Sequence, residues 1–211
     1  MSGGIMRTKS WWSGSDSRLL EAALGLAAVL VGVFQVLIPA LGVVGVIDPM
    51  NTREIEAATT TRVADTVTDA VAGHGMTLTG THQADLVFTG PDLGQRLLLA
   101  LPQIIDGLLL LLILAVLLQM ARTLRGGDVF VPMNARRLSV VGLTVLVQTT
   151  LAPVLLAFTT QILVSGAPMA EQIPFSATFT GEYVLLALLI LALGEVFRRG
   201  TKLRADTEGL V

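Results

Sequence analysis

Four long apolar stretches constrain this chain more than any other feature of its sequence. A helix needs about 20 mostly apolar residues to cross the hydrocarbon core of a bilayer. Lipid offers no hydrogen-bond partners to free peptide groups, so a segment that crosses it is expected to be helical. The stretches are residues 19–47, 97–121, 138–164 and 179–197. The sequence therefore predicts an all-α integral membrane protein with four transmembrane helices.

The composition agrees with a membrane protein. Charged residues are only 14% of the 211 residues and apolar residues are 53%, whereas soluble domains carry about 25% charged residues. Cysteine is absent, which excludes disulfides, thiol catalysis and cysteine-ligated metal sites.

The basic residues indicate the orientation in the membrane. Most of the 14 lysines and arginines lie in the tail 1–18, the loop 122–137 and the tail 198–211. The positive-inside rule places these segments in the cytoplasm. Residues 48–96 and 165–178 are then extracytoplasmic, and the protein is expected to be a multi-pass plasma-membrane protein with both termini cytoplasmic. The first apolar run is longer than the core of a signal peptide, which favours an uncleaved anchor over a cleaved signal.

The extracytoplasmic segment 48–96 is acidic and too small to hold a large core alone. Residues 52–72 are compatible with a short helix, and residues 76–79 and 85–88 have strand-like composition. A small hairpin over the outer helix ends is one arrangement. The two histidines, His74 and His82, are interpreted as solvated loop residues rather than metal ligands, since a metal site needs three or four converging ligands. No cofactor is predicted.

Small and polar residues recur along one face of the first span. Their spacing alternates between four and three residues, which keeps them on one side of a helix. These residues are Glu21, Gly25, Ala28, Gly32, Gln35, Pro39 and Gly42. Small residues allow close helix approach in lipid, and a buried Gln can bond across the contact. A packing seam is favoured over a transport pathway.

Three polar residues within the spans are candidates for function. Asp106 lies in the outer third of the second span, one turn after Pro102, and intramembrane acids raise a functional hypothesis by default. A transporter or an ion or proton pathway would bring Asp106, Gln35 and Gln148 together in one wet cavity.

The cytoplasmic ends carry a second group of candidates. Glu195 precedes Arg198 and Arg199 at the three- and four-residue spacing of helical ion pairs. Asn134 is expected to cap the N-terminus of the third span.

The sequence has no phosphate-binding loop with Lys and Ser/Thr, no HExxH motif, and no histidine within a span. We therefore expect a protein that is not an enzyme and has no catalytic residues.

Two cytoplasmic stretches carry a family resemblance. Residues Gly126–Leu138 read GGDVFVPMNARRL, and residues Glu195–Val211 read EVFRRGTKLRADTEGLV. Together they resemble bacterial membrane proteins of domain-of-unknown-function family 2975, although Val129 stands where the family often has proline. The resemblance implies a four-span protein of about this length with no established activity. Such proteins are often encoded beside a small helix-turn-helix regulator, which implies a membrane partner for a transcription factor.

Read on their own, the residues of these two stretches also suggest a cytoplasmic docking surface. Its candidate residues are Asp128, Phe130, Asn134, Arg136, Arg137, Glu195, Arg198 and Arg199. A rigid, lipid-anchored loop explains the same residues and is the favoured interpretation. The leading functional hypothesis is a non-enzymatic regulatory or sensory partner of a cytoplasmic helix-turn-helix regulator, without direct contact with nucleic acid. A small transporter or ion pathway and a structural subunit of a membrane complex are the alternatives, and homo-oligomerisation stays open.

Overall fold

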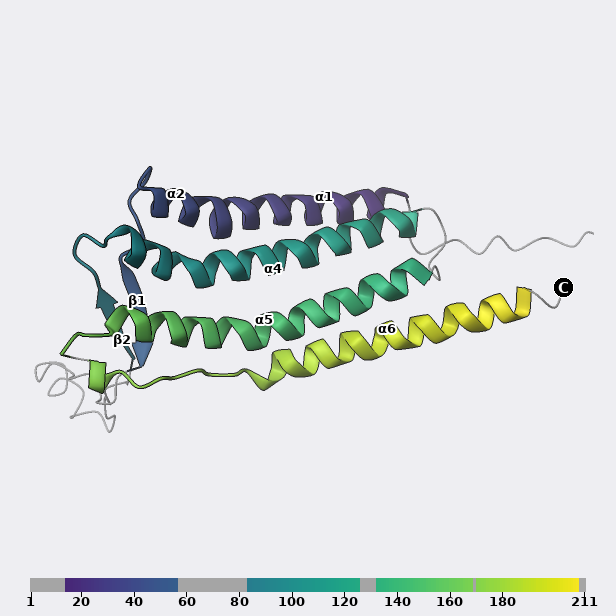
Figure 1. The fold of residues 1–211 in the computed structure, drawn as a ribbon. Helices are drawn as coiled ribbons and strands as arrows, with labels where there is room; N and C mark the ends of the chain where they lie inside the picture. The colour runs from purple at the N-terminus through teal and green to yellow at the C-terminus, as the bar shows by residue number, and fades with distance from the viewer. Residues whose placement is uncertain (1–13, 57–82, 126–131, 169, 209–211) are drawn as a thin grey trace, which may run out of the picture. The chain divides into compact units, whose positions relative to one another are not determined.

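The computed structural model describes residues 14–56, 83–125, 132–168 and 170–208. Its elements are labelled in Figure 1. In chain order they are α1 (Gly14–Val31), a π-helical segment (Gly32–Leu37), α2 (Ile38–Val44), β1 (Thr52–Glu56), β2 (Gln83–Val87), α4 (Leu93–Arg125), α5 (Pro132–Val164), a 3-10 turn (Ala170–Gln172) and α6 (Gly181–Glu208).

Three helical stretches in the described part of the chain are long and apolar enough to cross a membrane. They are Arg18–Val44, Leu93–Thr123 and Pro132–Val164. Helices α4 and α5 have 33 residues each, or about 50 Å at the rise of an α-helix. The chain therefore has the helices of a membrane-embedded protein.

The predicted fourth span, residues 179–197, is not among these three. Its helix, α6, begins only at Gly181. The uncharged run of α6 extends from Tyr183 to Gly194, between Glu182 and Glu195. A helix of that length rises about 18 Å, which is shorter than the hydrocarbon core of about 30 Å.

The first helical run exposes large side chains and covers small ones. Leu26, Val29 and Phe34 are each more than half exposed, while all seven residues of the predicted seam are partly or fully buried. The seam is not uniformly tight, since nothing lies within 4 Å of a Cβ built on Gly25. The run ends at Gly45, whose φ of 82° favours glycine, two residues before the end of the predicted span 19–47.

The chain divides into two compact units. The first, here called the helical unit, comprises Met1–Val33, Leu108–Gln148 and Gly181–Val211. The second, here called the sheet unit, comprises Phe34–Gly107 and Thr149–Thr180. Helices α4 and α5 contribute to both units.

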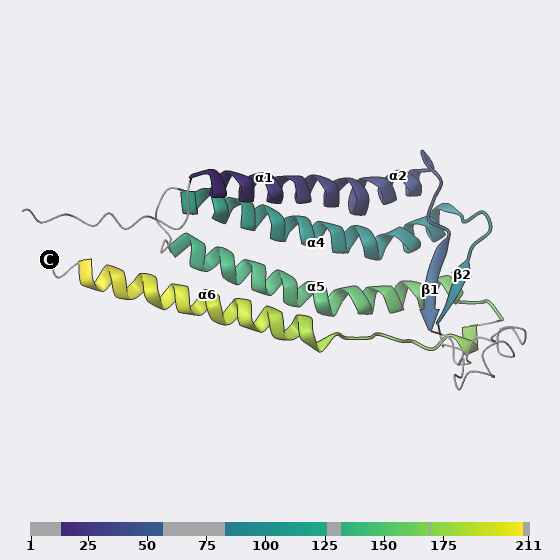
Figure 2. The same ribbon diagram turned by 180° about the vertical axis from the view of Figure 1, so that it is seen from behind.

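The helical unit has an apolar core and a close contact between two helices. The core is made by Ile113, Val116 and Val141, with Leu117, Val145 and Ile190 packed against it. Helices α5 and α6 lie side by side in this unit (Figures 1 and 2). A Cβ added to Gly142 would lie 2.8 Å from Leu191 Cγ, and one added to Gly194 would lie 2.9 Å from Ser139 Oγ. Glycines on both helices thus permit the approach.

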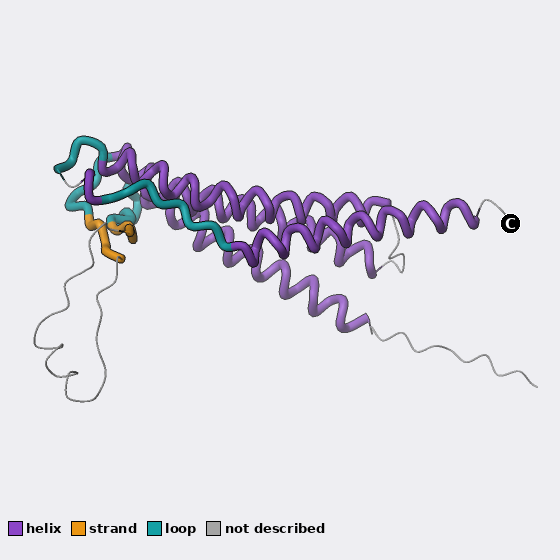
Figure 3. Tube along the Cα trace, turned by 90° about the horizontal axis from the view of Figure 1, so that it is seen from below, coloured by secondary structure: helices purple, strands orange, loops and turns teal. Residues whose placement is uncertain are grey.

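The sheet unit contains a two-stranded antiparallel sheet, drawn in orange in Figure 3, in which Thr52 pairs with Val87 and Glu56 with Gln83. The sheet adds a strand pair to the predicted all-α class. The prediction of a helix over residues 52–72 is wrong at its start, because Thr52–Glu56 is a strand with alternating burial. The strand predicted at 85–88 is confirmed, shifted to Gln83–Val87. Residues 57–82, which include the predicted strand 76–79, His74 and His82, lie outside the described residues.

A buried arginine connects this sheet to α4. Arg53 is 6% exposed, and its guanidinium donates to the carbonyls of Leu98 and Leu99 at 2.9 and 3.0 Å. Pro102 has no N–H for the carbonyl four residues earlier, which is that of Leu98. Arg53 replaces the missing donor. Burial lowers the pKa of Arg53, yet an arginine stays charged at neutral pH.

Candidate functional site

The best-defined polar cluster in the helical unit joins α4 to the first turn of α5. The side chain of Asn134 is 1% exposed. Its Oδ1 accepts from Thr123 Oγ1 at 2.9 Å and from Arg137 Nη1 at 3.3 Å. Arg137 Nη1 also lies 3.3 Å from the Gln119 carbonyl. One amide oxygen therefore holds two helices together.

The role predicted for Asn134 needs correction. Helix α5 already begins at Pro132, so Asn134 lies inside the first turn and is not the N-cap. Proline is favoured at the first helical position because its missing N–H has no intrahelical partner there. Pro132 starts the helix, which leaves Asn134 free to bond across to α4. Sequence reasoning missed Thr123 and Gln119, because local spacing does not reveal a partner on another helix.

Arg136 and Arg137 are neighbours with different surroundings. Arg137 is half-buried and takes part in the Asn134 cluster, whereas Arg136 is exposed. Both line a cavity of about 320 Å³. Its other lining residues are Val116, Gln119, Met133 and Val140. The cavity thus combines an apolar surface with two guanidinium groups.

The predicted ion pairs of α6 are present at the same end of the helical unit. Glu195 lies 2.7 Å from Arg198 Nε and 2.9 Å from Arg199 Nε. The adjacent Gly194 contacts Ser139 and approaches the carbonyl of Ala135, which brings the pairs beside the first turns of α5. The two arginine side chains are 74% and 77% exposed. Exposed pairs of this kind contribute little to stability, so their charges are available to other molecules.

We call this region the basic end. It comprises Thr123, Asn134, Arg136, Arg137, Glu195, Arg198 and Arg199. All the predicted docking residues in the described part of the chain belong to it. Asp128 and Phe130, also predicted for docking, lie outside the described residues.

The three candidate polar residues within the spans are divided between the two units. Gln35 and Asp106 belong to the sheet unit, and Gln148 belongs to the helical unit. Gln35 packs against α4, where a Cβ on Gly107 would lie 2.8 Å from its own Cβ. Its Oε1 is buried and has no hydrogen-bond partner among the described residues. One turn earlier on α4, Gln103 donates to the Phe34 carbonyl at 3.3 Å.

A comparison with protein families identifies the chain. The model of the family described as "Protein of unknown function (DUF2975)" matches residues 92–211, which is more than half of the sequence. The chain belongs to this family. No curated protein and no solved structure matches it.

The DUF2975 match confirms the predicted resemblance, and it covers only residues 92–211 of the chain. It spans α4, α5 and α6, and so includes every residue of the basic end. Gln35, β1 and β2 lie outside it.

Proposed function

We propose that this protein is a non-enzymatic regulatory component of the plasma membrane, whose basic end binds a cytoplasmic partner. The cavity beside Arg136 and Arg137 carries this proposal. Its apolar part can take an apolar side chain, and the two guanidinium groups can pair with carboxylates. The matching ligand is an amphipathic segment with acidic flanks, which fits the helix-in-groove mode of recognition.

The partner we propose is a helix-turn-helix transcription regulator. Support comes from family membership, because the resemblance to DUF2975 proteins implies that such a regulator is encoded nearby. The Asn134 cluster adds a physical argument, because it fixes the start of α5 and so presents Arg136 in a defined position. A preorganised surface binds with a smaller loss of conformational entropy than a flexible one.

The proposal requires the basic end to be cytoplasmic, which requires four crossings when the N-terminal tail is also cytoplasmic. The charge distribution supports this topology, and α6 would make the fourth crossing despite its short uncharged run. Absence of cysteine makes the test direct. Lys202→Cys should react with an impermeant maleimide only after cells are permeabilised, whereas Val87→Cys should react in intact cells. Equal reaction of both in intact cells would refute the topology.

Proximity labelling in native membranes, with the tag on the C-terminal tail, tests the partner. We expect the wild-type protein to label a helix-turn-helix protein and Arg136→Gln to lose most of that labelling. Arg122→Gln is the matched control, because Arg122 is an exposed arginine of α4 that does not line the cavity. Equal loss in both variants would indicate a general charge effect, and labelling of membrane proteins alone would favour a structural subunit.

A polar pathway is the second candidate function. The Oε1 of Gln35 favours it, because this buried atom has no partner in the part of the chain that the structure describes. Buried acceptors are normally satisfied, and a permeating proton or cation would supply a partner. Asp106 lies next to Gly107, which Gln35 contacts. Proton or cation flux into liposomes should fall in both Gln35→Leu and Asp106→Asn. Unchanged flux in both variants would exclude this pathway.

A further inference from the structure

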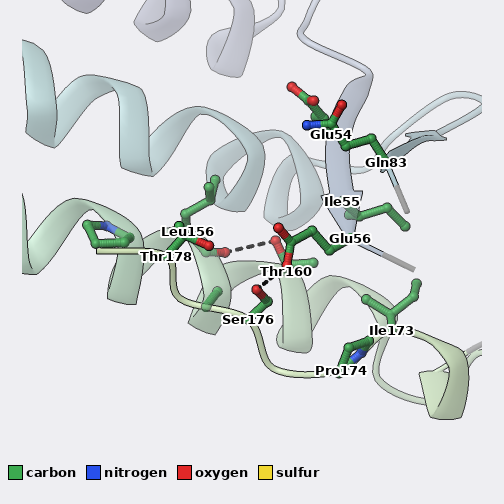
Figure 4. Close-up of a pocket in the computed structure, with 12 residues that line it drawn as sticks. Glu54, Ile55, Glu56, Gln83, Leu156, Thr160, Ile173, Pro174, Ser176 and Thr178 are labelled. Carbon is green, nitrogen blue, oxygen red and sulfur yellow. Dashed lines mark hydrogen bonds between the residues drawn. The ribbon is translucent and has the colours of Figure 1, made fainter. Parts of the chain in front are cut away.

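The sheet unit contains a cavity of about 260 Å³ beneath the strand pair. Its lining residues come from four segments that are distant in sequence: strand β1, strand β2, helix α5, and the extended stretch before α6 (Figure 4). The volume is just below the usual range for small-molecule sites, about 300–1,000 Å³, and therefore suits a ligand of few atoms. None of the residues of the basic end lines this cavity.

The apolar part of the lining comes from α5 and the extended stretch. It consists of Pro153, Leu156, Ala157, Ile173 and Pro174, together with Ile55 from β1. Ala157 and Ile173 are buried. This surface provides contacts for a short hydrocarbon chain or a single ring.

The polar part of the lining is acidic. Glu54 and Glu56 line the cavity with Gln83, Thr160, Ser176 and Thr178, and none of its described lining residues is basic. Glu56 extends toward Ser176, whose hydroxyl donates to Glu56 Oε2 (Figure 4). A carboxylate has about four acceptor positions, so Glu56 can accept further hydrogen bonds from a ligand.

The register of the sheet places a second acid beside Glu54, on the exposed side of the strand pair. Glu54 stands directly opposite Asp85, and like charges in that position destabilise a strand pair. Arg53 does not neutralise them, because its guanidinium is directed to the carbonyls of α4. A bound cation near Glu54 would reduce this repulsion.

We infer that this cavity binds a small organic ammonium ion, with the ammonium group on Glu56 and Glu54 and the apolar part on Leu156, Ala157 and Ile173. A metal ion fits less well. Metal sites need several convergent oxygen ligands, and no three acidic or histidine side chains come together in the described part of the chain. The inference does not depend on docking at the basic end.

Calorimetric titration of the full chain in phosphatidylcholine nanodiscs tests this inference, with 2-phenylethylammonium as the probe at neutral pH. The wild-type protein should bind it saturably. Glu56→Gln and Glu54→Gln should each weaken binding by about tenfold or more, which corresponds to the loss of a charge-assisted contact. The neutral analogue 2-phenylethanol should bind at least about tenfold more weakly than the ammonium ion.

Glu171→Gln is the matched control, because Glu171 is an exposed acid of the same unit that does not line the cavity. It changes the net charge equally and should leave binding unchanged. The size-exclusion profile of each variant reports whether it is folded. The inference is overturned if the probe does not bind, if all three glutamate variants bind alike, if the alcohol binds as well as the ammonium ion, or if calcium chloride binds in the same glutamate-dependent way.

Discussion

The two units differ in how regular their helices are. Seven of the eight prolines lie in the sheet unit, including Pro39, Pro102 and Pro153 inside helical segments. The proline of the helical unit, Pro132, stands at the start of α5, where it leaves no bond unmade. Most of the π-helical segment also belongs to the sheet unit.

This difference determines what each unit can do. An interior proline leaves a carbonyl without its helical donor, so the sheet unit has backbone acceptors that side chains must satisfy, as Arg53 and Gln103 do. The helical unit has no proline inside a described helix, and its helices α5 and α6 are held by close packing at Gly142 and Gly194. The first arrangement suits a site that binds or conducts small polar species, and the second suits a rigid support for a charged surface.

The largest effect is expected at the packed contact of the helical unit. In Gly142→Ala the new methyl group would lie 3.0 Å from the Leu191 backbone nitrogen, so a helix must shift, at a cost of about 2–3 kcal/mol. Gly25→Ala is the control. Space around Gly25 is open, and replacing a helical glycine there should stabilise the protein by about 0.5 kcal/mol. Equal responses of the two variants in unfolding titrations would contradict the packing described for α5 and α6.

The next largest effect is expected at Arg53 in the sheet unit. Arg53→Met leaves the Leu98 carbonyl without a donor, and an unsatisfied buried acceptor costs about 1–3 kcal/mol. The desolvation of the guanidinium is relieved at the same time, so a net loss of about 2 kcal/mol is expected. In the double variant Arg53→Met, Pro102→Ala, the restored N–H at position 102 should recover part of the loss. Strict additivity of the two changes would show that the proline and the arginine are not coupled.

Much of this molecule could be predicted from its sequence because hydropathy and charge act locally. The first three spans, the covered face that includes Gly32 and Gln35, and the Glu195 pairs all follow from spacing along one helix. The family was recognisable for the same reason, since its motif is a continuous stretch beginning at Gly126.

The features that could not be predicted depend on partners distant in the sequence. The strand at Thr52–Glu56 forms because it pairs with Gln83–Val87, and neither segment alone distinguishes a strand from a short helix. Likewise, Asn134 had the identity and position of a cap, but its bond to Thr123 on α4 gives it another role. The cavity beneath the sheet is assembled from four such distant segments.

A smaller effect is expected at Asn134. In Asn134→Ala, Thr123 and Arg137 lose a common acceptor, which should cost about 1 kcal/mol. Asn134→Asp keeps an acceptor and adds an opposite charge beside Arg137, so it should retain most of the stability. Unfolding titrations measure both, and labelling of the cytoplasmic partner should fall only in the alanine variant. Loss of labelling without loss of stability would show that Asn134 contacts the partner itself.

The smallest effect on stability is expected at Glu195. This residue also gives the clearest test of whether the basic end stabilises the helix or binds a partner. Its pairs with Arg198 and Arg199 are exposed, so Glu195→Gln should leave the unfolding midpoint unchanged. The same change releases two arginines and should increase partner labelling and its sensitivity to salt.

Glu182→Gln, at the other end of α6, makes the same charge change and should alter neither quantity. A lower midpoint in Glu195→Gln would mean that the pairs hold the end of the helix and do not regulate its charge. In that case the basic end would serve to stabilise α6, and the helical unit would have a structural role only.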